Sequence, residues 1–197
     1  MTTALAAAVA LVAVLGMQRR AQDERYATLL RDTSLPRGGM YVPTFTAPTV
    51  DGAAVTIGER TDGGKQVLFL FTTTCPYCKA SLPAVREVAL AAAQEPAPGA
   101  AMYGIALDSL SLAAEYAAAN DLRFPIVEFP ARKLRHLYRA RSVPIILVLN
   151  PEGRVVLGRT GVLENREAID SIVQAIRWST PDPARPTAAA AAAGGPQ

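Results

Sequence analysis

The stretch QVLFLFTTTCPYCK, residues 66–79, joins an uninterrupted apolar run to the only two cysteines of the 197-residue chain. The run at 66–71 has the length of a strand, and its lack of polar alternation is typical of a central strand buried on both faces. Pro76 suits the first turn of a helix, because the N–H that proline lacks would be unpaired there in any case. The stretch therefore predicts a buried strand that leads, through the cysteines, into a helix.

Alternating strand and helix patterns continue on both sides of this stretch. A hairpin with Asp51-Gly52 at its turn precedes it, since an Asp-Gly pair between two short apolar runs is typical of a tight turn. Downstream, strand patterns at 101–107, 124–130 and 142–150 alternate with helix patterns, and a last strand returns after a turn at 151–153. Because βαβ units imply parallel pairing and the closing hairpin is antiparallel, we predict an α/β fold with a mixed central sheet and helices on both faces. The predicted helices cover residues 76–94 (with a kink at Pro83), 109–120, 131–140 and 164–178.

Helical spacing predicts which side chains of two of these helices face the core. Leu112 and Tyr116 lie one turn apart and share a face of the helix at 109–120. In the basic helix at 131–140, we expect Leu134, Leu137 and Tyr138 to point inward, so Tyr138 should pack rather than bind a ligand.

The two ends of the chain differ in composition from its middle. Residues 1–17 carry no charged side chain, and a helix of that length spans roughly 25 Å, slightly less than a hydrocarbon core of about 30 Å. Arginines follow this run and none precedes it, which predicts a cytoplasmic domain by the positive-inside rule. We expect a transmembrane anchor at 1–17, a stalk or linker at 18–40, a folded domain at 41–178 and a disordered Pro/Ala tail at 179–197.

The charge pattern and the ligand count argue against nucleic acid and metal. The formal net charge is +3, acids and bases are interspersed, and no basic stripe carries aromatic side chains. Such a pattern is typical of a solvated surface, so we expect no nucleic-acid partner. A structural zinc site needs four Cys or His ligands, and the chain has two cysteines and one histidine, His136. We therefore expect no metal, and we expect His136 to be a surface residue.

The cysteines themselves point to redox chemistry. Cys75 falls between the buried strand and the N-terminus of the following helix, where unpaired backbone N–H groups and the helix dipole favour a thiolate. Cys78 lies one helical turn further, and its sulfur can reach the first one, as resolution of a mixed disulfide requires. A structural disulfide across four residues would remove little chain entropy. We therefore predict Cys75 as the attacking nucleophile and Cys78 as the resolving thiol, with Pro76 and Tyr77 between them.

Three segments resemble the thioredoxin superfamily, and in particular its membrane-anchored bacterial proteins of the TlpA/ResA/MauD type. VPTFTAPTVDGAAVTI at 42–57 is similar to the opening hairpin of that group, and KQVLFLFTTTCPYCKASLP at 65–83 is similar to its strand–CxxC–helix unit. FPIVEFPARKLRHLYRARSVPIILVLNPEGRVV at 124–156 is similar to its closing part. The resemblance covers about residues 42–178 and implies a thioredoxin-like fold behind an N-terminal transmembrane helix.

The resemblance also implies a function, namely a protein thiol–disulfide oxidoreductase with a redox-active Cys75–Cys78 disulfide and no other cofactor. It implies that Pro144 is a cis-proline that faces the cysteines, and that Val143 presents its backbone to the substrate chain. The implied partners are protein thiols or disulfides and a membrane or periplasmic redox protein, with reduction of clients favoured over oxidation. The resemblance places the domain outside the cytoplasm on a single-pass anchor in the bacterial cytoplasmic membrane, which disagrees with the arginines after the anchor.

Three positions depart from the pattern of the family. Phe69 and Ser81 stand where relatives carry acidic residues near the cysteines, and Thr74 stands in place of a tryptophan. The proton-transfer partner and the direction of electron flow therefore stay open.

Two other functions also stay open. Thr72, three residues before Cys75, matches one element of the peroxiredoxin motif, but Leu68 stands where that motif has a proline. A non-catalytic copper-handling protein of the same superfamily would use a CxxxC spacing, which is one residue longer than the spacing here.

Overall fold

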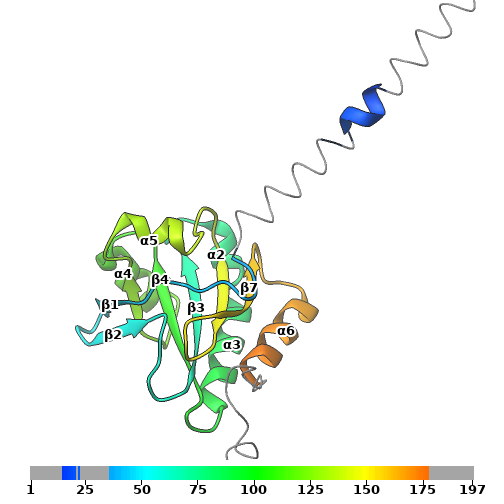
Figure 1. Ribbon diagram of the computed structural model, residues 1–197. Coiled ribbons are helices and arrows are strands. Elements are labelled where there is room, and N and C mark those ends of the chain that lie inside the picture. Colours follow the sequence, from blue (N-terminus) through cyan, green and yellow to red (C-terminus); the bar gives the residue numbers. More distant parts are fainter. Residues whose placement is uncertain (1–14, 21, 23–35, 178–197) are drawn as a thin grey trace, which may run out of the picture.

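The computed structural model describes residues 15–20, 22 and 36–177, and Figure 1 shows their arrangement. Residues 15–20 are helical. Among the described residues, no helix is long and apolar enough to cross a membrane. Most of the predicted anchor and stalk, Trp178 and the predicted tail lie outside the described residues.

The apolar run of the CxxC stretch forms β3 (Lys65–Phe71), the central strand of a five-stranded sheet in the order β5-β4-β3-β6-β7. β3 pairs in parallel with β4 (Ala100–Ala106) and antiparallel with β6 (Ile145–Leu149). The outer strands are β5 (Ile126–Glu128), parallel to β4, and β7 (Val155–Thr160), antiparallel to β6. The predicted mixed sheet is confirmed.

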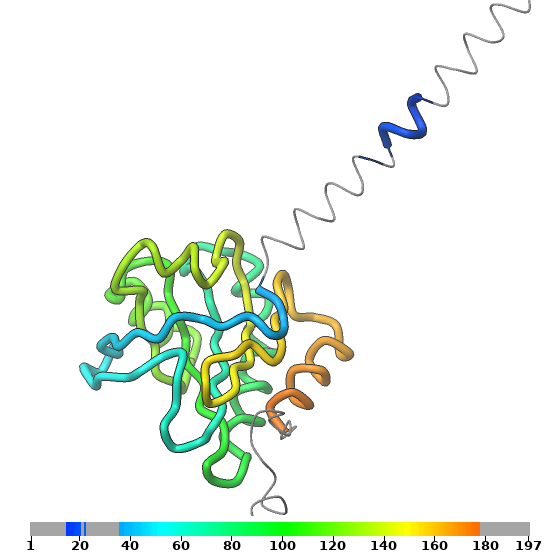
Figure 2. The backbone as a smooth tube through the Cα atoms, viewed as in Figure 1, coloured from blue at the N-terminus to red at the C-terminus, as the bar shows by residue number. Residues whose placement is uncertain are grey.

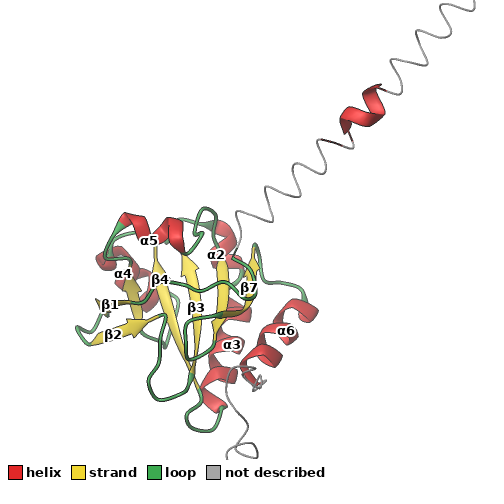
Figure 3. Cartoon of the chain, viewed as in Figure 1, coloured by secondary structure: helices red, strands yellow, loops and turns green. Residues whose placement is uncertain are grey.

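The hairpin and the helices also lie where the sequence predicts them, within a few residues at each end. β1 (Phe45–Pro48) and β2 (Ala54–Ile57) form an antiparallel two-stranded sheet of their own. Figure 3 shows α3 and α6 lying side by side against the large sheet. The helices are α2 (Pro76–Ala80), α3 (Leu82–Gln94), α4 (Leu110–Ala119), α5 (Arg132–Leu137) and α6 (Arg166–Arg177).

The side chains of β3 alternate between two buried cores. Val67, Phe69 and Phe71 face a cluster that includes residues of α3, α4 and α6. Leu68 and Leu70 face a second cluster, which the β1–β2 hairpin and α5 cover. Because both faces of β3 are buried, its sequence is apolar at nearly every position.

Gln66 is the buried polar residue of this strand, and it connects the hairpin to the large sheet. Its Oε1 accepts the Gly58 N–H at 2.7 Å, and its Nε2 donates to the Thr56 carbonyl at 2.8 Å. The buried amide is therefore hydrogen-bonded on both sides, as burial of a polar group requires.

The predicted kink at Pro83 is instead a break between two helices. Ser81 lies between α2 and α3, and its N–H bonds to the carbonyls of Tyr77 and Cys78. Pro83 sits in the first turn of α3, where a backbone N–H would have no partner within the helix in any case. The helix α2, which carries Cys78, is therefore a separate short helix of five residues.

Two of the leucines predicted to face the core are in fact exposed. Leu112 is 51% exposed, because α4 approaches the first core with the small side chain of Ala113 and with Tyr116. Leu137 is 44% exposed, because α5 ends there and the next side chain, Tyr138, is fully buried in the second core. The expectation that Tyr138 packs is confirmed.

Gly153 in the turn between β6 and β7 provides a test of this packing. It has φ +78°, and a Cβ there would overlap the carbonyl oxygen of Gly58. Gly52 has a similar φ of +85° but no atom within 4 Å of a Cβ. We expect Gly52→Ala to lower the free energy of unfolding by about 1 kcal/mol from backbone strain alone. Gly153→Ala should lower the free energy of unfolding by about 1–3 kcal/mol more than Gly52→Ala, because its Cβ would also overlap the Gly58 carbonyl oxygen.

Chemical denaturation of the two variants beside the unmodified chain measures this difference. Equal losses for Gly52→Ala and Gly153→Ala would contradict the close contact between the 150–154 turn and the loop at Gly58.

Candidate active site

Cys75 lies at the junction between the carboxyl end of β3 and the N-terminus of α2. It is the N-cap residue of α2, with extended backbone (φ −78°, ψ 115°), and its Sγ accepts the N–H of Cys78 at 3.3 Å. The second partner of Sγ is the carbonyl of Val143, at 3.7 Å. Because the sulfur takes the place of a capping oxygen, a negative charge on it is stabilised by the helix N–H groups. Cys75 is half-buried, so a partner can reach it.

Cys78 lies behind Cys75 and belongs to the first core. Both cysteines are free thiols, and Cys78 is completely buried. The pKa of the Cys78 thiol is raised to about 12, mainly by burial and to a smaller extent by Cys75 and the Asp108 carboxylate, whereas a hydrogen bond with the Thr72 backbone opposes the shift. The Cys75 thiol is thus partly open to solvent, whereas the Cys78 thiol is enclosed in the core.

The loop before β6 faces the cysteines from the other side. The Val143–Pro144 peptide bond is cis, and Pro144 is buried. Val143 is half-buried and contacts both cores, and the Pro144 carbonyl accepts the Gly161 N–H at 3.0 Å, which joins the loop to the end of β7. This loop therefore holds the Val143 carbonyl rigidly beside the Cys75 sulfur.

The remaining residues of the motif differ in exposure. Pro76 and Tyr77 are exposed, Tyr77 to 62%. An exposed aromatic ring beside an accessible sulfur offers an apolar contact to a docked chain. His136 is also exposed, and no three His, Cys, Asp or Glu side chains in the described part of the chain are placed to hold a metal ion.

The positions at which relatives carry acids have other roles here. Phe69 is fully buried and stacks on Phe71, with 5.2 Å between ring centroids and 7° between planes. Ser81 is fully buried, and its hydroxyl donates to the Tyr77 carbonyl at 2.8 Å and accepts the Leu163 N–H at 3.0 Å. Ser81 therefore holds the break between α2 and α3 against the start of the C-terminal segment.

Asp108 is an acidic residue near the cysteines that the sequence analysis did not identify as part of the site. Its Oδ2 accepts the backbone N–H of Thr73 at 2.5 Å and the Thr73 hydroxyl at 2.8 Å. Ser109, not Asp108, caps α4, because its hydroxyl accepts the Leu112 N–H. The sequence carries one signal for this role, because Asp108 directly follows the strand pattern at 101–107. Parallel strands such as β3 and β4 end at the same side of the sheet, so a residue just after β4 lies close to the residues just after β3.

Tyr116 is a second residue that spacing alone does not connect with the site. Its ring stacks on Phe71 at 5.5 Å, and its hydroxyl is buried without a hydrogen-bond partner among the described residues. Burial raises the pKa of Tyr116, and the nearby charges of Cys78 and Cys75 raise it further. Tyr116 therefore packs in the same core as Cys78, with its hydroxyl buried.

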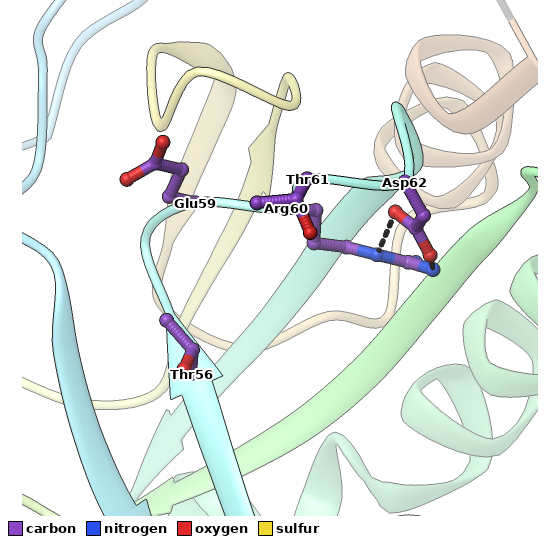
Figure 4. Close-up of a pocket in the computed structure, with 5 residues that line it drawn as sticks. All are labelled: Thr56, Glu59, Arg60, Thr61 and Asp62. Atoms are coloured by element: carbon purple, nitrogen blue, oxygen red, sulfur yellow. Dashed lines mark hydrogen bonds and ion pairs between the residues drawn. The ribbon is translucent and has the colours of Figure 1, made fainter.

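A pocket on the domain lies away from the cysteines. Figure 4 shows it in the loop between β2 and β3, and its lining residues are Thr56, Glu59, Arg60, Thr61 and Asp62. Arg60 Nε donates to Asp62 Oδ1 at 2.8 Å, and this hydrogen bond lowers the pKa of Asp62. Arg60 also donates to the Lys65 carbonyl at 3.0 Å, so the pair fixes the loop at the start of β3, at the edge opposite the cysteines.

Comparison with known proteins assigns the chain to a family. Residues 39–157, more than half of the chain, match the AhpC/TSA family. The chain belongs to the AhpC/TSA family. The matched range contains the hairpin, the CxxC junction and the cis-proline loop.

Curated relatives and solved structures agree with this assignment. This AhpC/TSA family protein is 27% identical to methylamine utilization protein MauD of Methylobacillus flagellatus over 164 residues, 78% of this chain and 76% of MauD. It is 26% identical over 121 residues to sporulation thiol-disulfide oxidoreductase A of Bacillus subtilis, which is 59% of this chain and 70% of that protein.

Two solved structures share the fold. The thioredoxin domain of a thiol-disulfide oxidoreductase from Bacteroides vulgatus superposes with a TM-score of 0.60 at 16% identity, over 71% of this chain and 98% of that one. StoA from Bacillus subtilis superposes with a TM-score of 0.54 at 23% identity, over 65% and 95%. The predicted membership of the thioredoxin superfamily is confirmed, and the fold is thioredoxin-like.

The contact between Asp108 and the cysteine region leads to a prediction about Cys78. The negative charge of Asp108 opposes ionisation of Cys78, so Asp108→Asn should lower the pKa of Cys78, by less than about one pH unit because burial dominates. The pH dependence of iodoacetamide alkylation, compared between Cys75→Ser and Cys75→Ser with Asp108→Asn, measures this shift.

Two control variants separate the effect of the Asp108 charge from the effect of losing its hydrogen bonds to the loop at Thr73. Thr73→Ala removes a donor to Asp108 but keeps the carboxylate, and Glu128→Gln removes a carboxylate that instead accepts the Leu110 N–H. Neither should shift the alkylation profile downward. An unchanged profile in the Asp108→Asn variant would contradict the electrostatic contact.

Proposed function

We propose that this protein is a thiol–disulfide oxidoreductase that exchanges disulfides with protein clients through Cys75 and Cys78. The observation that carries the proposal is the arrangement of the two sulfurs: Cys75 Sγ is accessible and capped by the Cys78 N–H, and Cys78 is buried directly behind it. An accessible sulfur stabilised by helix N–H groups suits attack, and a buried thiol with a raised pKa suits a later step.

In the proposed reaction, the Cys75 thiolate attacks one sulfur of a client disulfide. The client S–S bond breaks, one client sulfur leaves as a thiolate and takes up a proton, and Cys75 is joined to the client in a mixed disulfide. Cys78 then loses its proton and attacks Cys75, the bond to the client breaks, and the second client thiol leaves. The client gains two electrons and two protons, and Cys75 and Cys78 become a disulfide.

Val143 and Pro144 serve as the client-binding loop in this proposal. The Val143 carbonyl contacts Cys75 Sγ, so a client sulfur bonded to Cys75 would lie next to this backbone group. Main-chain groups can bind an extended client segment regardless of its sequence. The exposed rings of Pro76 and Tyr77 add apolar contact on the other side of the sulfur.

The relatives support the chemistry of the proposal. Sporulation thiol-disulfide oxidoreductase A is named for this exchange, and MauD matches the chain over most of its length. We propose that residues 1–17 anchor the chain, that the domain acts outside the cytoplasm, and that a membrane or periplasmic redox protein reduces the Cys75–Cys78 disulfide after each turnover. Reduction of clients is the favoured direction.

Trapping of the mixed disulfide tests the assignment of roles. With a disulfide-containing protein such as insulin, Cys78→Ser should accumulate a covalent adduct through Cys75, because attack proceeds and resolution does not. Cys75→Ser should form no adduct, since the remaining thiol is buried. Both variants should lose catalysis of insulin reduction by dithiothreitol. An adduct through Cys78 in the Cys75→Ser variant would contradict the assignment.

A peroxidase of the same family is the second candidate, since the match to the AhpC/TSA family and Thr72 three residues before Cys75 favour it. The Cys75 sulfur contacts the Cys78 N–H and the Val143 carbonyl, whereas Thr72 meets Cys75 only through its carbonyl, which accepts the Cys75 N–H at 3.4 Å. Peroxide consumption by the reduced chain, measured beside insulin reduction, separates the two. Fast peroxide turnover without disulfide exchange would select the peroxidase.

A further inference from the structure

The segment 131–143, which contains α5 and leads to the cis-proline loop, carries an unusual concentration of positive charge. It has no Asp or Glu, and its cations are Arg132, Lys133, Arg135, Arg139 and Arg141. These five charges exceed the formal net charge of +3 of the whole chain. The acidic residues that balance the sequence as a whole are therefore placed elsewhere.

The cations of this segment are not balanced by ion pairs within the described residues. Several other arginines of the domain do pair with carboxylates, as in Arg123 with Asp121 and Arg166 with Glu87. Within residues 36–177, no carboxylate lies within ion-pair distance of Arg132, Lys133, Arg135 or Arg141, or of Lys79 on α2. We call these five residues the cationic surface. All except the half-buried Arg135 are exposed.

The cationic surface lies along the edge of the domain that carries α2 and the cysteines. Figures 1 and 2 show α5 and the residues after it along the same edge of the domain as α2. Arg141 is two residues before Val143, whose carbonyl contacts Cys75 Sγ at 3.7 Å, and Lys79 follows Cys78 directly. A protein segment that docks at Cys75 therefore approaches the edge of the domain that carries these charges.

The segment that carries the charges is held in place by the second core. Tyr138 is fully buried, its hydroxyl donates to the Pro43 carbonyl at 2.8 Å, and its ring meets Phe45 and Phe129 at 5.8 and 5.2 Å between centroids. The backbone that carries the charges of α5 and the residues after it is thus held in place before a partner arrives. Like charges held close together repel one another, and an anionic partner relieves that repulsion.

We propose that the cationic surface selects protein clients whose disulfide lies beside acidic residues. The proposal rests on the proposed exchange reaction and adds its substrate class. An acidic protein segment fits better than an anionic lipid surface, because the charges share the edge of the domain that carries α2, and a membrane docked on that edge would cover Cys75. Charge complementarity of this kind acts mainly on the association rate and weakens with salt.

Two disulfide peptides that differ only in flanking residues, four glutamates or four lysines, test the proposal with the full-length chain. At low salt, the glutamate peptide should be reduced about tenfold faster than the lysine peptide, and about 0.5 M salt should remove most of this advantage. Arg132→Glu with Lys133→Glu should abolish or reverse the preference. Acidic residues suit the first turn of α5, so the helix should persist.

A matched control variant keeps the same change in charge but places it elsewhere. Arg123→Glu with Arg154→Glu alters two cations before β5 and in the β6–β7 turn, at the edge of the sheet opposite Cys75, and should keep the preference for glutamate. The neutral reagent 4,4′-dithiodipyridine reports the thiol chemistry by itself and should react equally with all three chains.

The outcomes distinguish the two proposals. If neither peptide nor the neutral reagent is reduced, the proposed exchange function fails. If all are reduced and the peptides react at equal rates, the function stands and the client preference is overturned. Equal peptide rates, combined with binding to phosphatidylserine vesicles that Arg132→Glu with Lys133→Glu abolishes, would assign the surface to lipid instead.

Discussion

The structure depends on the burial of β3 on both of its faces. Hydrogen bonds to β4 on one side and β6 on the other satisfy its backbone, and its side chains alternate between the two cores. A strand held this way has a fixed end, so the position of Cys75 at its exit is determined before any local interaction of the cysteine is considered. The antiparallel return of β6 brings the Val143–Pro144 loop to that same end. One strand thus positions both the nucleophile and the backbone group that faces it.

The site departs from the pattern of its relatives in its polar residues, and the structure shows how the region is held without them. Phe69 joins an aromatic stack with Phe71, and Tyr116 continues that stack from α4. Ser81 uses its hydroxyl to connect the break after α2 to Leu163. The negative charge near the CxxC motif comes from Asp108, which accepts two hydrogen bonds from Thr73, two residues before Cys75. Burial therefore dominates the environment of Cys78, with Asp108 as a smaller electrostatic contribution.

The sequence of strands and helices along the chain and the CxxC junction could be predicted, because each rests on a local pattern of apolar residues. The predictions that Leu112 and Leu137 face the core are wrong. Helical spacing does not show that the small side chain of Ala113 packs against the core in place of Leu112, or that Tyr138, after the end of α5, does so in place of Leu137. Asp108 was missed because its partner, Thr73, is 35 residues away and meets it only through the pairing of β3 with β4. The sequence shows that the helix at 131–140 is basic. Only the structure shows that no carboxylate of the described residues pairs with Arg132, Lys133, Arg135 or Arg141, and that the helix shares an edge with α2.

The central claim is that Cys75 and Cys78 form one redox couple. Equilibration of the full-length chain in buffers of increasing glutathione disulfide, followed by acid quenching and mass analysis of alkylated thiols, tests it directly. The account predicts a single two-electron transition from two free thiols to none, with a peptide that contains a Cys75–Cys78 disulfide as the product. Two free thiols at every buffer ratio, or stable glutathione adducts on the separate cysteines in place of that disulfide, would contradict it.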